Sequence, residues 1–221
     1  MRFLQGFTPT DLLIVPAALI AIIFHEFSHG LVAYWLGDKT AQERGRLSLK
    51  PWRHIDPLGL VLLVVAGFGW AKPVPVDLRY FKKPRRDFAL VGLAGPVSNF
   101  LLALPALFLY TLTDMLAPAL WDGLLALFFL YLAIVNVGLG VFNLFPIPPL
   151  DGSKVVGLLV PDRIYYRILA YERYGMALLA LLLFTGVLDG PLGFLREQVF
   201  YGLSYVASRP FVWFGLVRLV A

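Results

Sequence analysis

The residues best suited to chemistry form the segment His25-Glu26-Phe27-Ser28-His29, an H-E-x-x-H pattern near the N-terminus. On a helix, residues four positions apart share one face and lie about 6 Å apart along the axis. Two imidazoles at this spacing can hold one zinc ion, and the glutamate between them can act as a general base. The segment therefore predicts a metal site in which His25 and His29 are ligands and Glu26 is the base.

A catalytic zinc site needs a third protein ligand and an open position for water. The chain has no cysteine, so the third ligand must be a histidine or a carboxylate. Trp35 stands where the soluble H-E-x-x-H-x-x-G-x-x-H pattern places a third histidine. The remaining candidates are His54, Asp56 and Asp151. Asp151 is favoured because it follows a long apolar stretch that ends on the same side of the membrane as the histidines, although an ordinary Asp-Gly turn is the alternative.

The composition places these residues in a membrane protein. Of the 221 residues, 59% are hydrophobic and 15% are charged, whereas a soluble domain is about half apolar and about a quarter charged. The apolar residues form blocks of about 20, the length that a helix needs to cross a bilayer core of about 30 Å. We therefore expect an all-α polytopic membrane protein with four to five transmembrane helices, forming a single domain over residues 1–221.

Four stretches are predicted to span the membrane, and they cover about 11–36, 88–112, 120–145 and 171–188. The last part of the chain, 192–221, is also apolar, but charged residues interrupt it. It predicts either one more span or a helix that lies in the membrane interface.

Lysine and arginine gather in three connecting segments, 38–57, 72–87 and 151–175, while the loop 113–119 has none. Cytoplasmic loops of membrane proteins collect such residues. The three basic segments are therefore predicted to be cytoplasmic, with the active site towards that side and the N-terminus outside. The net charge of +5 has the same explanation, so a nucleic-acid partner is not expected.

The short apolar stretch 58–71 has too few residues to cross the membrane, and both its flanks are predicted to be cytoplasmic. It should enter and leave by the same face. Alternating residues in 46–50 and 72–77 predict two strands beside it, so we expect a re-entrant and β-hairpin region around 45–77. Two prolines confine the second strand to an edge, where it could capture an unwound substrate by backbone pairing.

These features resemble the site-2 protease family of intramembrane zinc metalloproteases. The first and last of the matching motifs are specific in combination, and the others support them. The motifs cover residues 25–29, 54–59, 69–76, 94–99 and 143–152.

The resemblance implies a role for each residue that matches a family motif. His25, His29 and Asp151 would bind one Zn²⁺ per chain. Glu26 would be the catalytic base, and Asn143 would take part in substrate handling near the metal.

The resemblance also implies an activity, namely zinc-dependent cleavage of transmembrane segments of membrane proteins within the bilayer. Regulated intramembrane proteolysis and the removal of signal-peptide remnants are both compatible with it. The expected location is the cell membrane of a bacterium or archaeon. The length leaves no room for the PDZ or CBS domain of many relatives, so a short form is expected. The sequence indicates neither the substrate nor the oligomeric state.

A metal or proton transporter or channel is the competing interpretation, because ionisable residues in spans also mark ion paths. Such a protein would bind zinc without cleaving peptides. A scaffold without activity is disfavoured, since the base and all three ligands are present. His54 and Asp56 are predicted to form a turn or cap or to orient a ligand, and Asn99 to join helices or to line the cavity.

Overall fold

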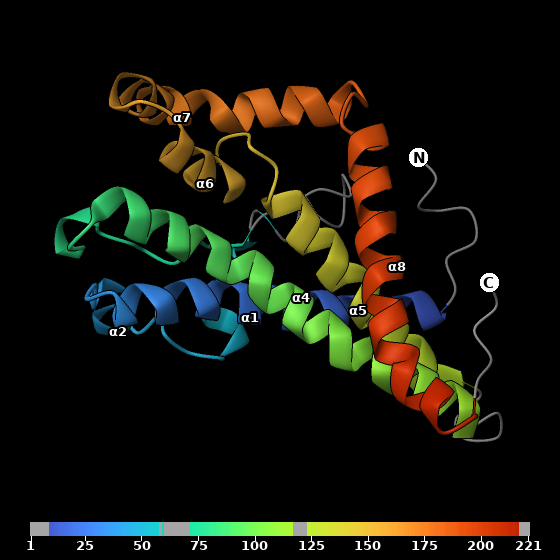
Figure 1. The fold of residues 1–221 in the computed structure, drawn as a ribbon. Coiled ribbons are helices and arrows are strands. Elements are labelled where there is room, and N and C mark those ends of the chain that lie inside the picture. Colours follow the sequence, from blue (N-terminus) through green and yellow to red (C-terminus); the bar gives the residue numbers. More distant parts are fainter. Residues whose placement is uncertain (1–8, 58, 60–70, 117–122, 217–221) are drawn as a thin grey trace.

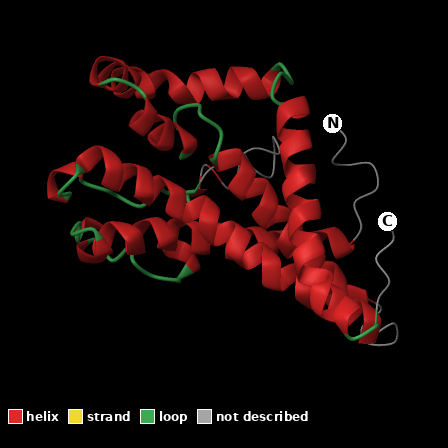
Figure 2. Cartoon of the chain, viewed as in Figure 1, coloured by secondary structure: helices red, strands yellow, loops and turns green. Residues whose placement is uncertain are grey.

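The fold is a bundle of helices around one long central helix (Figure 1). The computed structural model describes residues 9–57, 59, 71–116 and 123–216. Within these ranges the regular structure is entirely helical and contains no strand (Figure 2). The predicted all-α class is confirmed.

The elements follow the apolar blocks of the sequence. In chain order they are the 3-10 helix η1 (Pro9–Leu13), α1 (Ile14–Trp35), α2 (Thr40–Glu43), η2 (Pro51–Arg53), η3 (Leu78–Tyr80), α4 (Pro84–Leu116), α5 (Leu124–Asn143), α6 (Gly152–Leu159), α7 (Asp162–Phe184) and α8 (Asp189–Trp213).

Helix α4 is the centre of the bundle and packs against α1, α5, α6 and α8. Its 33 residues correspond to a length of about 50 Å, which exceeds the thickness of a bilayer core. Helices α1 and α4 run antiparallel, because His29 contacts Val91 while the earlier residue His25 contacts the later residue Asn99. This arrangement lays one face of α4 along the two histidines.

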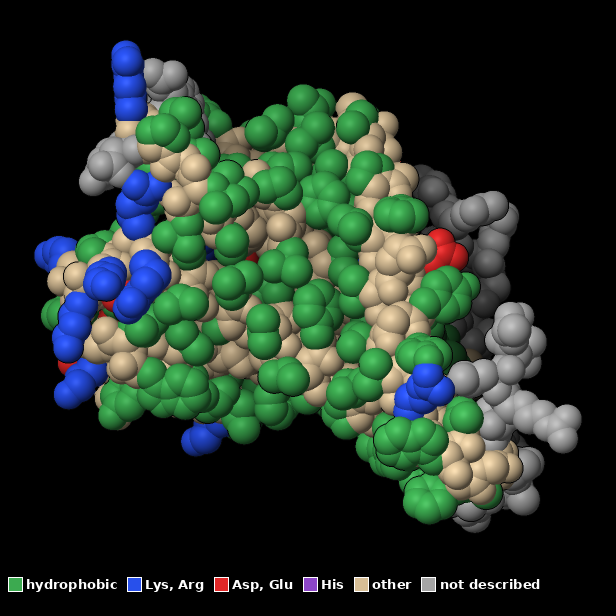
Figure 3. Space-filling view, viewed as in Figure 1, with side chains coloured by type: hydrophobic (Ala, Val, Ile, Leu, Met, Phe, Trp, Pro, Cys, Tyr) green, Lys and Arg blue, Asp and Glu red, His purple; other side chains and the backbone are tan. Residues whose placement is uncertain are grey.

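The surface of the bundle is apolar where a soluble protein would be polar. Leu101, Leu181 and Phe194 expose 66%, 59% and 61% of their surface, and hydrophobic side chains cover the middle of the molecule (Figure 3). In the described part of the chain, α1, α4 and α5 are each long and apolar enough to cross a membrane. The protein is an integral membrane protein.

The predicted span near 171–188 falls mostly in α7, and the described part of 192–221, predicted to be a span or an interfacial helix, falls mostly in α8. The helix axis turns by 87° between Tyr174–Phe184 and α8. The two pieces are long and apolar enough to cross a membrane only when they are taken together. The described helices thus offer three spans, or four if this bent pair is one span.

The strand predicted at 46–50 does not form. The backbone there makes local turns, in which the N–H groups of Arg46 and Leu47 both donate to the carbonyl of Ala41. Local hydrogen bonds satisfy these groups, and the alternation does not follow burial, because Arg46 is buried while Leu49 is exposed.

The strand predicted at 72–77 also does not form, although Asp77 at its end has an extended backbone. Prolines remove two N–H groups, and the N–H of Val74 donates to the carboxylate of Glu26 on α1. One isolated antiparallel bridge joins Ile55 to Ala71. The re-entrant course expected for this segment falls on residues 58 and 60–70, which lie outside the described part of the chain.

Replacement of Gly140 by valine should destabilise the packing of α5 on α4. A Cβ atom at Gly140 would lie 2.6 Å from the ring of Phe100, whereas one at Gly138 would meet only Arg196 Cδ, at 3.9 Å. Gly140→Val should cost about 1–3 kcal/mol of stability through overpacking, measured as a lower midpoint of thermal unfolding in detergent. Gly138→Val is the matched control, and equal effects of the two substitutions would contradict this account of the helix interface.

Candidate metal centre

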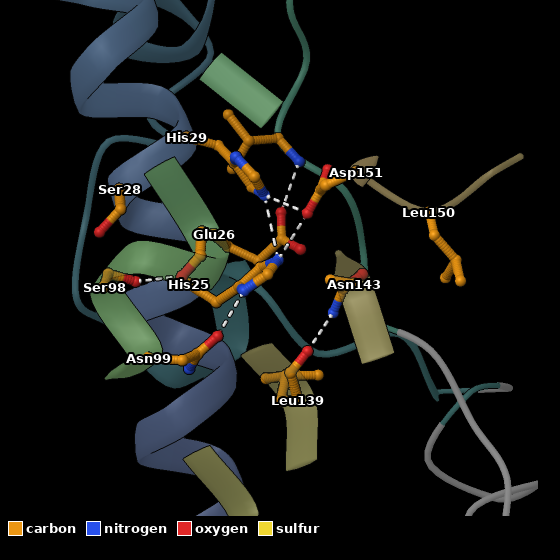
Figure 4. A network of polar contacts seen from close by, with 12 residues as sticks. His25, Glu26, Ser28, His29, Ser98, Asn99, Leu139, Asn143, Leu150 and Asp151 are labelled. Atoms are coloured by element: carbon orange, nitrogen blue, oxygen red, sulfur yellow. Dashed lines mark hydrogen bonds and ion pairs between the residues drawn. The ribbon is translucent and has the colours of Figure 1, made fainter. Parts of the chain in front are cut away.

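Three side chains from α1 and the start of α6 meet at one point inside the bundle. His25 Nε2 lies 3.0 Å from His29 Nε2 and 3.1 Å from Asp151 Oδ2, and His29 Nε2 is also 3.1 Å from that oxygen. All three residues are buried, and Figure 4 shows their side chains converging. We refer to His25, His29 and Asp151 as the His–His–Asp cluster.

The Nδ1 atom of each imidazole, on the side of the ring away from Asp151, makes a hydrogen bond to α4. His29 Nδ1 donates to the backbone carbonyl of Val91 at 2.6 Å, since a carbonyl can only accept. His25 Nδ1 donates to Asn99 Oδ1 at 2.7 Å (Figure 4). The Asn99 amide in turn donates to the carbonyl of Ala21 and to the side chain of Asn136 on α5. Both rings are thus oriented with Nε2 towards Asp151.

The donor set fits a metal ion. With Nδ1 protonated, each neutral imidazole directs a lone pair at Nε2 towards the other ring and towards a carboxylate oxygen. Three electron-pair donors this close repel one another unless protons or a cation lie between them. A tetrahedral zinc with bonds of about 2.0–2.1 Å would space its ligands about 3.3 Å apart, close to the separations of 3.0–3.1 Å seen here. Among the described residues this is the only group of three or more such side chains placed to bind a metal.

Asp151 reaches the histidines because the chain turns back after α5 and places this residue at the N-cap of α6. Burial by itself raises the pKa of Asp151, but His29 and His25, when a proton rather than a metal occupies Nε2, and the ammonium of Lys154 outweigh it and hold that pKa below the usual range of a carboxyl. The side chain is therefore ionised, which is the form that binds a metal.

Glu26 follows His25 on α1 and is half-buried. Its Oε2 accepts a hydrogen bond of 2.9 Å from the backbone N–H of Val74. The contact ties the carboxylate to segment 72–77, and Figure 4 shows Glu26 beside the His–His–Asp cluster. A base in this place can serve a reaction at the cluster.

The other residues singled out from the sequence do not join the cluster. His54 is fully buried and bonds the carbonyl of Ser48, and Asp56 accepts from the N–H of Gly59, as a helix cap does. Asn143 donates to the carbonyl of Leu139 on its own helix (Figure 4). Asn99 joins three helices, which is one of its two predicted parts, and it also bonds His25.

Two basic residues at the site were missed by sequence reasoning. Lys154 pairs with Asp151 Oδ1 at 2.7 Å, a contact that the i,i+3 spacing at a helix start could have suggested. Arg46 donates to the carbonyls of Lys72 and Pro73 at 2.5 and 3.3 Å, and this contact had no signal in the sequence.

Comparison with known proteins gives a consistent result. The sequence profile of Peptidase family M50 matches residues 114–185, a range that includes Asn143 and Asp151. "Putative zinc metalloprotease YwhC" of Bacillus subtilis is 43% identical over 177 residues, 78% of this chain and 80% of the relative. "Putative zinc metalloprotease Rip2" of Mycolicibacterium smegmatis is 30% identical, over 80% of this chain and 69% of the relative.

An archaeal protein, "Putative zinc metalloprotease MJ0611" of Methanocaldococcus jannaschii, is 27% identical over 71% of this chain and 77% of its own length. No solved structure matches the chain. The apolar helices, the His–His–Asp cluster and these relatives together define a membrane-bound metalloendopeptidase. The chain belongs to Peptidase family M50, the site-2 protease family.

Replacement of Gly95 by alanine should disrupt the cluster. A Cβ atom at Gly95 would lie 2.5–2.6 Å from ring atoms of His25 and 2.6 Å from His29 Nε2. The rings must therefore move, and we expect Gly95→Ala to lose most of the zinc bound by the purified protein, as measured by elemental analysis. Gly138→Ala, which introduces the same side chain on α5 with no contact closer than 3.9 Å, should retain wild-type zinc. Full zinc occupancy in Gly95→Ala would show that α4 does not set the histidine positions.

Asn99 and Asn143 offer a second matched pair, because both lie near the cluster and only Asn99 bonds a histidine. Asn99→Leu should weaken zinc binding about 10- to 100-fold, the usual effect of removing a group that orients a ligand. Asn143→Leu should leave zinc affinity unchanged. Competition with a zinc-binding fluorophore measures both constants, and equal affinities in the two variants would refute the role of Asn99.

Proposed function

We propose that this protein is a zinc-dependent intramembrane endopeptidase that cleaves transmembrane segments of other membrane proteins. The observation that carries the proposal is the convergence of His25, His29 and Asp151 within 3.1 Å, next to Glu26, in a bundle whose helices α1, α4 and α5 can span a membrane. The relatives named as zinc metalloproteases support the choice of metal.

The His–His–Asp cluster would hold the zinc, which when bound supplies a Lewis acid that acidifies water and polarises a peptide carbonyl. Glu26 takes the proton of the attacking water and delivers it to the nitrogen of the breaking C–N bond. The Val74 N–H fixes the orientation of Glu26 for both transfers. Val91 and Asn99 keep the two imidazoles in the tautomer that presents Nε2.

Segment 72–77 contacts this base through Val74, and we propose that it also contacts the substrate. A helical substrate hides its carbonyls in internal hydrogen bonds and must unwind before it can be cleaved. Arg46 fixes the first carbonyls of the segment, and the remaining backbone offers an edge for an unwound peptide. We propose that Asn143, at the end of α5, also contacts the substrate near the metal.

We propose that the site lies towards the cytoplasm and that the N-terminus is outside. Lys and Arg gather at the end of the molecule that carries the last turns of α1 and the start of α4 (Figure 3), and such residues favour the cytoplasmic side. His29 and His25 lie about 9 and 15 Å from the end of α1 at Trp35. The bacterial and archaeal sources of the relatives support a cell membrane of one of these groups.

Substitutions in the cluster should separate metal binding from catalysis. Asp151→Ala and His25→Ala should lose zinc, because two ligands cannot hold it as three do. Glu26→Gln should keep zinc but cleave about 100- to 10,000-fold more slowly, the usual contribution of general acid–base catalysis.

The measurement uses purified protein in lipid nanodiscs, elemental analysis for zinc, and a panel of labelled single-span peptides as cleavage probes. Wild-type protein that binds no zinc would contradict the proposal, as would cleavage by Glu26→Gln at the wild-type rate. A zinc-loaded wild type that cleaves no peptide of the panel but moves ions across vesicles would favour a transporter.

A further inference from the structure

The two oxygens of Asp151 have different surroundings. Oδ2 lies 3.1 Å from the Nε2 atoms of both His25 and His29. Oδ1 points the other way and lies 2.7 Å from Lys154 Nζ. A carboxylate can bind a metal through one oxygen or through both, and the ion pair with Lys154 engages the second oxygen.

Helix α4 fixes Lys154 in this place. The alkyl chain of Lys154 runs over Gly92, where a Cβ atom would lie 3.0 Å from Lys154 Cδ and 3.1 Å from its Cβ. Its ammonium group lies 5.2 Å from the centre of the Phe88 ring. The side chain is 21% exposed, in contrast to the 85% exposed side chain of Arg79 in its pair with Asp77. Lys154 is thus packed against α4 along most of its length.

The pair joins a buried ligand to a cation and so differs from an ordinary surface ion pair. Exposed pairs contribute little, because water screens them, but the Asp151 side chain is only 7% exposed. Without Lys154, Oδ1 would be an ionised oxygen left without its cation in a buried place, which is strongly unfavourable. A bound metal would then be the nearest positive charge available to it.

We propose that Lys154 is a positioning residue that restricts Asp151 to one-oxygen ligation and so limits the metal to three protein donor atoms and one water. Lys154 acts through Asp151 and touches neither metal nor substrate. The inference rests on the proposed zinc site and adds the control of its coordination number.

The test compares Lys154→Met, Lys154→Arg and wild type after replacement of zinc by cobalt(II). The visible absorption of cobalt(II) is weaker in five-coordinate than in four-coordinate sites, so it reports the number of ligands. The methionine keeps the packing over Gly92 and Phe88 but removes the charge, whereas the arginine keeps the charge. Lys50→Met is the matched control, since the Lys50 ammonium lies 6.0 Å from the Trp52 ring centre, in a loop apart from the cluster.

We expect Lys154→Met to bind one cobalt ion with a weaker visible band. Its kcat on the peptide panel should be about one tenth of the wild-type value or less. Lys154→Arg and Lys50→Met should keep the wild-type spectrum. If Lys154→Met does not fold, Lys154→Gln replaces it. A wild-type spectrum in Lys154→Met overturns the inference. So does a band in Lys154→Arg that is as weak as the band in Lys154→Met. A wild-type protein that binds neither cobalt nor zinc refutes the proposed function instead.

Discussion

Three electron-pair donors held within 3.1 Å of one another are the constraint on which the rest of the structure depends. Such a group is stable in an apolar bundle only if positive charge lies among its members. The surrounding structure is consequently arranged to hold the donors in place. Carbonyl and amide oxygens of α4 bind the outer nitrogen of each ring, and Lys154 binds the outer oxygen of the carboxylate.

Helix α4 carries much of this arrangement without supplying a ligand. From Phe88 to Asn99 it contributes an aromatic ring, a carbonyl, two glycines at close contacts and an amide. These positions are three or four residues apart or nearly so, and they therefore fall along one side of the helix. The antiparallel α1 presents its histidines to the carbonyl and the amide on that side. The polar chain from His25 through Asn99 to Asn136 then fixes α4 against α5.

The sequence predicted the site better than the loops around it. The pairing of His25 with His29 was predictable because helix geometry alone puts positions i and i+4 on one face. Asp151 depended on a chain reversal after α5, which prolines suggested but could not specify. The strands at 46–50 and 72–77 were wrongly predicted, because alternation does not show whether another strand is present to pair. In this case Glu26 took the hydrogen bond of Val74.

The roles of Lys154 and Arg46 could not be predicted for a related reason. Both side chains are long and basic, and a basic residue at a membrane boundary has an ordinary explanation in topology. Their contacts, with the carboxylate of Asp151 and with the carbonyls of Lys72 and Pro73, become visible only once distant segments are in place.

The wide separation of the ligands along the chain has a consequence for biosynthesis. His25 and Asp151 are 126 positions apart, so the ribosome has synthesised α1, α4 and α5 before it adds the last ligand. Until that point, the incomplete protein lacks the third ligand that a catalytic site requires. A hydrolytic enzyme that shares its bilayer with other newly made proteins thus acquires its reactive centre only after the helices that hold that centre have been synthesised.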